Sequence, residues 1–271
     1  MNIYEKITNL INENKSFVLA TVIKTEGSTP GKVGFKMIIE SDGKCQGTIG
    51  GGAIEGEVII ESLRRLSTSE SGIVEYLLSG EVLVEKETAK VLEMSCSGRQ
   101  WIFYEVFGQK PVVYVFGGGH VGEALLRQLS LLNYRKILID NRPEFANKHK
   151  NPFADEIILD DYVKYASTFN PPENSFVVVM THGHNYDFDI VKIIYERNLK
   201  LKYVGVIASK SKAQKLINQL KEKFGAELNL DNFHSPIGLN IGGETPQEIA
   251  LSIASEIQAI RYNKTNITHL Q

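Results

Sequence analysis

The stretch YVFGGGHVGEALLRQLSLLNYRKILIDNRPEF, residues 114–145, decides the fold of the second half of this chain. An apolar run ends at a glycine-rich turn, an amphipathic segment follows, and a second apolar run ends at an aspartate. Gly117, Gly119 and Gly122 have the G-x-G-x-x-G spacing between a predicted strand and a predicted helix, which is the context that makes this spacing informative. The stretch therefore predicts one βαβ unit of a Rossmann-like sheet.

Each of these three glycines has an expected role. Gly117 permits the turn, Gly119 lets a pyrophosphate approach the backbone, and Gly122 allows the helix to pack closely. Asp140 ends the next strand, where a carboxylate can accept hydrogen bonds from a ribose diol and so favours NAD, although Arg142 weakens that preference. The alternative is that the glycines only shape the turn, because a fold persists after its ligand changes.

Strand-like and helix-like patterns continue to alternate through residues 109–271. This alternation predicts a mainly parallel, doubly wound sheet with helices on both faces. The last helix has a capping box at Thr245 and Glu248, with a proline at its first position. The other predicted elements are strands at KILIDN, EIILD, SFVVVMTHG and YVGVIAS, and helices over residues 121–132, 189–198 and 212–224.

Residues 1–108 have a different pattern, which predicts a small α+β domain. An amphipathic helix is expected near the N-terminus, and Asp42 with Gly43 predicts the turn of a hairpin. Residues 108–111, a Gly-to-Pro segment, are the expected linker. The other expected elements are strands SFVLATVIKT, GIVEYLL and QWIFYEVF, and a helix from Ala53 that buries Ile54, Val58, Leu63 and Leu66.

Composition limits the classes of function. The chain has 271 residues, a formal charge of −2 and a pI near 6.3, so a nucleic-acid partner or an anionic membrane surface is not expected. Neither a signal peptide nor an apolar run of about 20 residues is recognisable, which predicts a cytoplasmic protein. Two cysteines are too few for a disulfide framework or a four-cysteine zinc site.

Histidines gather at the predicted carboxyl edge of the Rossmann sheet, where ligands bind in such folds. His120 follows the glycine turn, and His182 and His184 belong to the run THGHNYD. That run is similar to the H-x-H-x-D-H motif of metallo-β-lactamase-like hydrolases, but Asp187 comes one position late and no histidine follows it. We therefore expect His182 and His184 to be hydrogen-bonded loop histidines in the crevice, without a bound metal.

Six blocks in both halves resemble the XdhC and CoxI family, the accessory proteins of xanthine dehydrogenase. They are EGSTPGKVGFKMII with GTIGGGAIEGEV, VFGGGHVGEAL, IDNRPEFA, VMTHGHNYD, YVGVIASK and HSPIGLNIGGETPQEIALSIASEI. The resemblance implies a carrier rather than a turnover enzyme, which binds the molybdenum cofactor (molybdopterin) and delivers it in sulfurated form to a xanthine dehydrogenase-type molybdoenzyme. It also favours a homodimer, and makes a cysteine desulfurase a candidate second partner.

Two segments depart from the family pattern. Ser97 follows Cys96 where the family commonly has Cys-Gly-Gly, and Ala208 stands where many members have glycine. An added side chain in either loop narrows the approach of the backbone to a phosphate.

The N-terminal half contains its own candidate site residues. Cys96 lies beside Arg99, which favours the thiolate that ligates molybdenum or carries sulfur, whereas Cys45 is expected to pack within its hairpin. Glycines Gly50, Gly51 and Gly52 precede a helix and could offer unpaired amides to an anion. Glu55 faces the same turn, either as a cap of its amides or as a contact to a pterin ring.

Two other functions remain open from the sequence. The Rossmann domain could serve an NAD-dependent oxidoreductase, although no separate catalytic domain with an evident proton donor is recognisable. A metal-dependent hydrolase at His182 and His184 is the third hypothesis.

Overall fold

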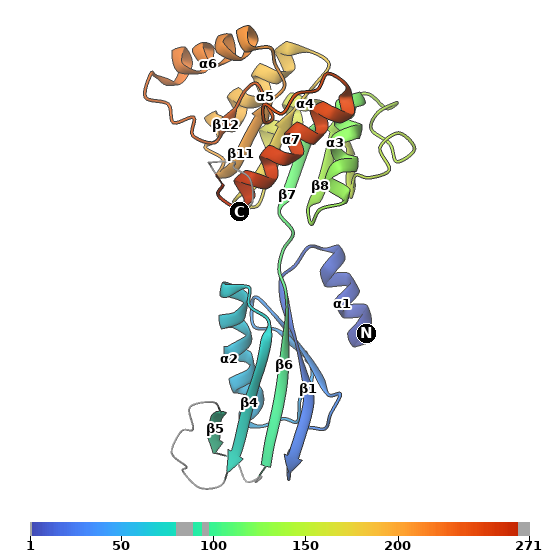
Figure 1. Ribbon diagram of the computed structural model, residues 1–271, viewed down its shortest axis with the longest axis vertical. Coiled ribbons are helices and arrows are strands. Elements are labelled where there is room, and N and C mark those ends of the chain that lie inside the picture. The colour runs from blue at the N-terminus through green and yellow to red at the C-terminus, as the bar shows by residue number, and fades with distance from the viewer. Residues whose placement is uncertain (1, 80–88, 94–97, 265–271) are drawn as a thin grey trace. The chain divides into compact units, whose positions relative to one another are not determined.

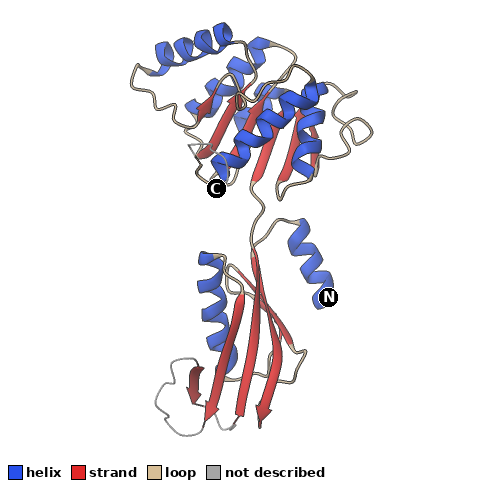
Figure 2. Ribbon diagram, viewed as in Figure 1, coloured by secondary structure: helices blue, strands red, loops and turns tan. Residues whose placement is uncertain are grey.

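The structure is a computed structural model of the chain, and it describes residues 2–79, 89–93 and 98–264 (Figures 1 and 2). The chain divides into two compact units, Met1–Gln109 and Lys110–Gln271. The first is a mixed sheet with helices and the second is a parallel sheet covered by helices, which confirms the predicted fold class.

The N-terminal unit is built on a six-stranded sheet in the order β3-β2-β1-β6-β4-β5. Its neighbouring strands are antiparallel, except for β4 and β5, which pair in parallel. β5 was not predicted from the sequence. The elements are α1 (Ile3–Asn12), β1 (Phe17–Gly27), β2 (Lys36–Glu40), β3 (Cys45–Gly47), α2 (Ala53–Thr68), β4 (Gly72–Ser79), β5 (Ala89–Glu93) and β6 (Gly98–Phe107).

Alternation along β1 gives this sheet two apolar faces. Val18 and Val22 pack in the core with Ile54 and Val58 of α2. Residues of the opposite parity on β1 form a second, smaller core with α1. Leu63, which was expected to face the sheet, is instead 37% exposed, so the apolar face of α2 is narrower than predicted.

Two glycine-rich segments of the N-terminal unit dock backbone against backbone. A β-carbon on Gly31 would lie 2.0 Å from the carbonyl oxygen of Ile49, and one on Gly50 would lie 2.4 Å from the nitrogen of Gly31. The buried side chain of Gln100 donates to the same Ile49 carbonyl at 2.9 Å. The loop at residues 27–31 and the turn at residues 48–52 therefore form one packed layer at the end of the sheet.

The C-terminal unit contains a six-stranded sheet in the order β12-β11-β10-β7-β8-β9, in which every pairing is parallel. The chain order reverses between β7 and β10, which is where ligands bind in doubly wound sheets. The elements are β7 (Val112–Phe116), α3 (His120–Ser130), β8 (Arg135–Asp140), β9 (Glu156–Leu159), α4 (Tyr162–Thr168), β10 (Ser175–Val179), α5 (His184–Glu196), β11 (Leu201–Val206), α6 (Lys210–Phe224), β12 (Phe233–His234) and α7 (Pro246–Arg261).

Helices cover both faces of this sheet, as predicted. Val113 and Val115 of β7 pack with α3 and α7, while Tyr114 and Phe116 pack with α4, α5 and α6. The capping box of α7 is confirmed, because Thr245 and Glu248 cap each other's backbone amides. The short helix α4 was missed.

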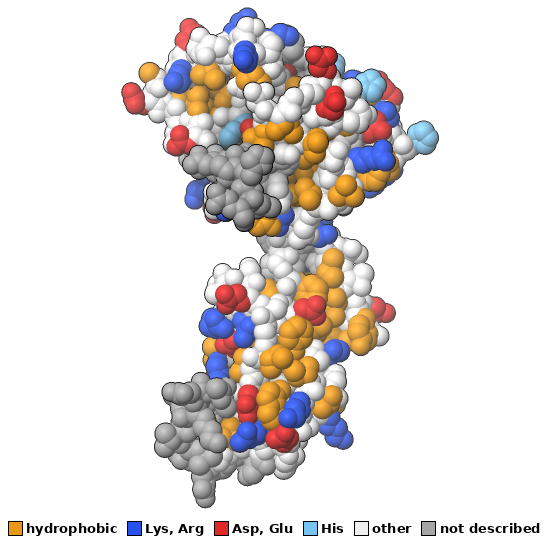
Figure 3. Space-filling model, in the orientation of Figure 1, with side chains coloured by type: hydrophobic (Ala, Val, Ile, Leu, Met, Phe, Trp, Pro, Cys, Tyr) orange, Lys and Arg blue, Asp and Glu red, His pale blue; other side chains and the backbone are white. Residues whose placement is uncertain are grey.

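The described surface carries charges of both signs. On the face drawn in Figure 3, cationic and acidic side chains are interspersed rather than gathered by sign. None of the helices in the described part of the chain is long and apolar enough to span a membrane.

The docking of the two glycine-rich segments gives a test of stability. Gly31→Ala should lower the free energy of unfolding by about 1–3 kcal/mol, because the new methyl group overlaps the Ile49 backbone. Gly56→Ala is the control, since Gly56 lies in α2 with open space around it, and alanine there should raise stability by about 1 kcal/mol. Urea denaturation of the full chain measures both, and equal effects of the two substitutions would contradict the packing.

Candidate functional site

The glycine turn between β7 and α3 is the best-formed feature at the switch point. Gly117 has φ +114°, and a β-carbon there would lie 2.3 Å from the Met180 carbonyl oxygen. A β-carbon on Gly122 would lie 2.0 Å from the carbonyl oxygen of Gly117. Packing and conformation of the protein alone therefore require both of these glycines.

Gly119 is different. Its φ is −66°, which any residue adopts, and a β-carbon there would meet no atom within 4 Å. The fold thus gives no reason for a glycine at this position. Empty space beside the backbone is what the close approach of a ligand requires.

Helix α3 begins at His120 with Gly119 as its N-cap, and no side chain among the described residues caps it. His120 is exposed at the mouth of the turn. Glu123, the acid of the first turn, forms an ion pair with Lys150 at 2.6 Å. First-turn amides and the helix dipole together favour an anion at this end of α3.

Asp140 ends β8 at the predicted place, but protein donors already surround its carboxylate. The side chain is buried and accepts hydrogen bonds from the Gly118 amide and from the backbone and guanidinium of Arg142. Burial alone would raise the pKa of Asp140, yet these hydrogen bonds and the Arg142 charge lower it. Asp140 is therefore ionised and engaged by the protein itself.

The THGHNYD run begins a helix rather than forming a loop, which corrects the expectation for His184. α5 starts at His184, whose side chain lies outside the described part of the structure. His182 is exposed next to the rings of Tyr162 and Tyr186. The helix extends this far because no glycine or proline interrupts residues 184–188.

Asp187 has a structural role in this turn. It is 5% exposed, and it accepts hydrogen bonds from the Thr181 amide at 3.2 Å and the Thr181 hydroxyl at 2.6 Å. Within the described residues, no group of three or more His, Cys, Asp and Glu side chains is placed to hold a metal ion. The absence of a metal at His182 and His184 stays a prediction.

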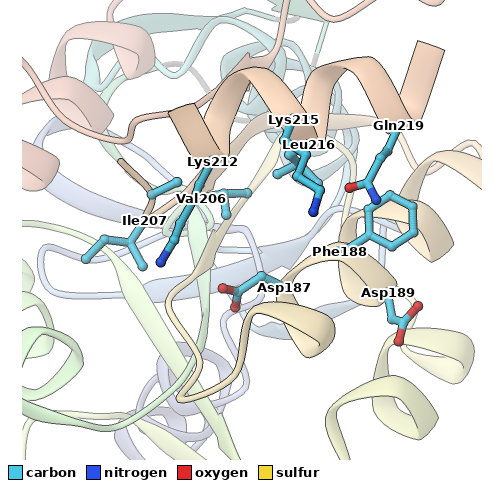
Figure 4. Close-up of a pocket in the computed structure, with 10 residues that line it drawn as sticks. Asp187, Phe188, Asp189, Val206, Ile207, Lys212, Lys215, Leu216 and Gln219 are labelled. Atoms are coloured by element: carbon cyan, nitrogen blue, oxygen red, sulfur yellow. The ribbon is translucent and has the colours of Figure 1, made fainter. Parts of the chain in front are cut away.

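A cavity of about 420 Å³ lies between α5 and α6 at the end of β11 (Figure 4). Lys212 and Lys215 reach toward it from α6, opposite Asp187 and Phe188 of α5. This cavity was missed from the sequence, although Lys212, Lys215, Leu216 and Gln219 recur at helical spacing on one face of α6.

Two amides of the Gly50–Gly52 turn, those of Gly50 and Gly51, already have partners within the protein. Glu55 accepts hydrogen bonds from the amides of Ile49 at 3.1 Å and Gly51 at 3.0 Å, and from the Thr48 hydroxyl at 2.5 Å. Burial alone would raise the pKa of Glu55, but the Thr48 hydroxyl and the amides outweigh it and lower the pKa. Of the two roles considered for Glu55, the structure shows the cap.

Only one of the two cysteines, Cys45, lies in the described part of the chain. Cys96 lies outside the described residues. Cys45 is exposed, contrary to the expected packing, because β3 is a three-residue strand at the edge of the sheet. Partial burial of its sulfur, with the charges of Glu55 and Asp42, raises its pKa and keeps it a thiol.

Arg99 was expected to stabilise a thiolate at Cys96, and this stays a prediction because Cys96 lies outside the described residues. The Arg99 guanidinium forms an ion pair with Glu75 at 3.1 Å.

The Glu55 cap predicts a pH-dependent stability. Glu55→Gln should lower the free energy of unfolding by about 1–2 kcal/mol at pH 7, since an amide oxygen is a weaker acceptor than a carboxylate. The folded pKa is depressed, so the wild-type advantage is present above the ordinary carboxyl pKa of 4.5 and is lost as the pH falls through the folded value. Urea unfolding at pH 7 and at lower pH checks the sign.

Glu57→Gln is the matched control, because Glu57 is a partly exposed acid of the same helix in an ion pair with Lys90. Such a pair contributes about 0–1 kcal/mol. A Glu55 variant whose deficit stays constant or grows toward acid pH would contradict the cap.

Comparison with known proteins agrees with this architecture. Residues 113–257 match the model of the XdhC Rossmann domain, and residues 10–77 match that of the XdhC and CoxI family. "Uncharacterized protein YqeB" of Escherichia coli (strain K12) is 31% identical over 97% of this chain, which spans only 47% of that protein. A probable xanthine dehydrogenase subunit of Bacillus subtilis (strain 168) is 23% identical, with 94% of this chain and 96% of that protein covered.

Among solved structures, a crystal structure named as a xanthine dehydrogenase from Bacillus halodurans matches 99% of this chain and 98% of its own. The TM-score is 0.52 at 22% identity, so the match concerns the fold alone. The family model of the Rossmann domain covers more than half of the chain and contains the whole glycine turn. The chain belongs to the XdhC and CoxI family.

Proposed function

We propose that this protein is a carrier that binds the molybdenum cofactor as cargo and delivers it, in sulfurated form, to a xanthine dehydrogenase-type molybdoenzyme. Family membership and the name of the Bacillus subtilis relative support the choice of cargo and partner. The observation that carries the proposal is the empty space at Gly119, beside an uncapped helix N-terminus at the switch point.

The phosphate end of the pterin is the part of the cargo that this site suits. The proposed phosphate contacts are the backbone amides of Gly119 and His120 at the start of α3, and the nearby acid Glu123 is paired with Lys150. A phosphate gains from both the amides and the helix dipole. His182 and the start of α5 follow β10 at the same edge of the sheet and are proposed to contact the rest of the pterin.

Cys96 is the proposed ligand of the molybdenum end or carrier of its sulfur. The alternative thiol, Cys45, has a raised pKa and is therefore a poor thiolate donor at neutral pH. The Gly50–Gly52 turn is a weaker candidate than its sequence suggests, since the Gly50 amide donates to the Thr48 hydroxyl and the Gly51 amide to Glu55.

The rival NAD-dependent oxidoreductase shares the glycine turn but needs a free acceptor for the ribose. The four donors around Asp140 weigh against it. A cytoplasmic homodimer that serves a two-fold symmetric target, with a cysteine desulfurase as sulfur donor, completes the proposal.

The decisive experiment is to purify the protein from cells that make the cofactor and to measure molybdenum by elemental analysis and oxidised pterin by fluorescence. The loaded protein is then mixed with a cofactor-free molybdenum hydroxylase, and the recovered hydroxylase activity is followed. Protein that carries neither pterin nor molybdenum, or that fails to activate the hydroxylase, would remove the carrier function.

Gly119→Val should reduce bound pterin at least tenfold, because a branched side chain fills the space reserved for the phosphate. The free energy of unfolding should fall by only about 1 kcal/mol, the cost of replacing a favourable N-cap residue, so the variant stays folded. Gly119→Ala should give a smaller loss, and Gly56→Ala, a methyl group added in open space elsewhere, should give none. Pterin content and urea unfolding are the two measurements; full loading of Gly119→Val would exclude the turn.

Cys96→Ala should abolish delivery of active cofactor, while Cys45→Ala should leave it unchanged. The reason is that ligation or sulfur transfer needs a thiolate, and the pKa of Cys45 is raised. Activation of the cofactor-free hydroxylase is compared for both variants at equal protein concentration. The assignment fails if the Cys45 variant is the defective one.

A further inference from the structure

We propose that Asp140, Arg142 and Asn151 make the glycine turn selective, so that it takes a phosphate or diphosphate group and rejects a ribose diol. These are positioning residues, because they act through the two peptide groups that flank Gly118. The inference rests on the proposed function for its natural ligand, but it concerns the chemistry of the turn and is tested without that ligand.

The acceptor capacity of Asp140 is used up within the protein. Its Oδ1 accepts from the Arg142 backbone amide at 3.0 Å and from the Arg142 Nε at 2.9 Å. Its Oδ2 accepts from the Gly118 amide at 2.7 Å and from a terminal nitrogen of Arg142 at 2.8 Å. An ionised carboxylate has about four acceptor sites. All four are occupied, and the residue is 0% exposed.

A ribose diol could reach this carboxylate only by displacing donors that bind it well. The guanidinium contributes two charge-assisted hydrogen bonds in a bidentate arrangement, roughly twice as strong as neutral ones. Arg142 is held further by Phe145, whose ring centre lies 3.9 Å from the guanidinium carbon. Exchange of these bonds for two neutral hydroxyl donors is unfavourable, so the diol is rejected.

Asn151 fixes the second peptide of the turn. It is 1% exposed, and its side-chain amide donates to the carbonyl oxygens of Gly118 at 3.1 Å and Phe145 at 2.7 Å. The peptide between Gly118 and Gly119 is planar and trans, so its N–H points opposite to its carbonyl. With the carbonyl held toward buried Asn151, the Gly119 N–H is directed away from it.

The turn is therefore rigid before any ligand arrives. Asp140 holds the peptide on one side of Gly118 and Asn151 holds the peptide on the other. A β-carbon on Gly118 would lie 2.8 Å from the Asn151 amide nitrogen, which explains the glycine between Gly117 and Gly119. The turn offers hydrogen-bond donors, whereas its carboxylate acceptor is already bonded. It therefore suits a phosphate oxygen, which accepts hydrogen bonds, and does not suit a ribose hydroxyl, which would have to donate one.

The test uses the purified full chain and calorimetry with three probes: inorganic pyrophosphate, adenosine and NAD. The parent should bind pyrophosphate, should not bind adenosine, and should bind NAD no more tightly than pyrophosphate. Arg142→Ala frees two acceptor sites of Asp140, so affinity for NAD relative to pyrophosphate should rise about tenfold or more.

Arg135→Ala is the matched control for that variant. Arg135 begins the same strand that Asp140 ends, its side chain is 27% exposed against 25% for Arg142, and it is paired with Glu156. The affinity ratio should not change in this control. Arg142→Lys keeps the charge but loses the bidentate geometry, and should shift the ratio in the same direction by a smaller factor. Arg142→Lys replaces Arg142→Ala in this test if the alanine variant does not fold.

Asn151→Ala should weaken pyrophosphate without creating adenosine binding, because it releases the Gly119 amide but not Asp140. The inference is overturned if the parent binds NAD or adenosine more tightly than pyrophosphate, if it binds no pyrophosphate, or if a folded Arg142 variant keeps the parental ratio. Carriage of molybdopterin is measured separately. A loaded carrier that prefers NAD refutes only the selectivity, and a selective turn in a protein without cargo refutes only the carrier function.

Discussion

The contact between Gly122 and the carbonyl of Gly117 is the constraint on which the C-terminal unit depends. With 2.0 Å between that oxygen and the place of a β-carbon, α3 can lie this close to the sheet only if the residue is glycine. The close approach brings the start of α3 to the ends of β7 and β10, where the sheet reverses its order. The residues proposed to select the ligand act at that position. Asp140 and Asn151 form hydrogen bonds with Gly118 of the glycine turn.

The N-terminal unit also depends on glycines that let two backbone segments come into contact. Gly31 and Gly50 let two loops touch without side chains between them, and Glu55 then satisfies the amides that the turn exposes. Helices α2 and α3 both begin after a glycine N-cap without a side-chain cap. Each preceding turn also donates an amide to a carboxylate, Gly51 to Glu55 and Gly118 to Asp140. What distinguishes α3 is its place at the switch point of a parallel sheet, with open space beside Gly119, and this is the main reason for placing the phosphate there.

Local pattern was sufficient for the fold class and for the main elements of both units. Glycine spacing and alternating apolar runs predicted the Rossmann sheet, and the Thr245–Glu248 capping box predicted α7. These signals can be recognised because they are set by residues close to one another in the sequence. The start of α5 was missed, since a polar run such as HNYD has no strong helical period. β5 and α4 were also missed.

The site was predicted less completely than the fold. The position of Asp140 followed from the motif, but its partners did not, because Asn151 comes from the far end of the segment after β8 and Arg142 folds back onto the strand. Exposure of Cys45 depends on β3 being an edge strand, which is a property of the whole sheet. Side chains that come into contact only through tertiary structure have no characteristic spacing in the sequence, so they cannot be recognised from it.

The freedom around Gly119 has a consequence for how this family diverges. Gly117 and Gly122 are demanded by the backbone, so they should persist in any descendant that keeps the fold. Gly119 meets no steric limit, and its place as the N-cap of α3 also accepts Ser, Asn or Asp, so only the ligand requires a glycine there. Family members that no longer bind the cargo should therefore have residues other than glycine at position 119, while positions 117 and 122 stay glycine. A substitution at position 119 would then indicate loss of function in a protein whose fold is unchanged.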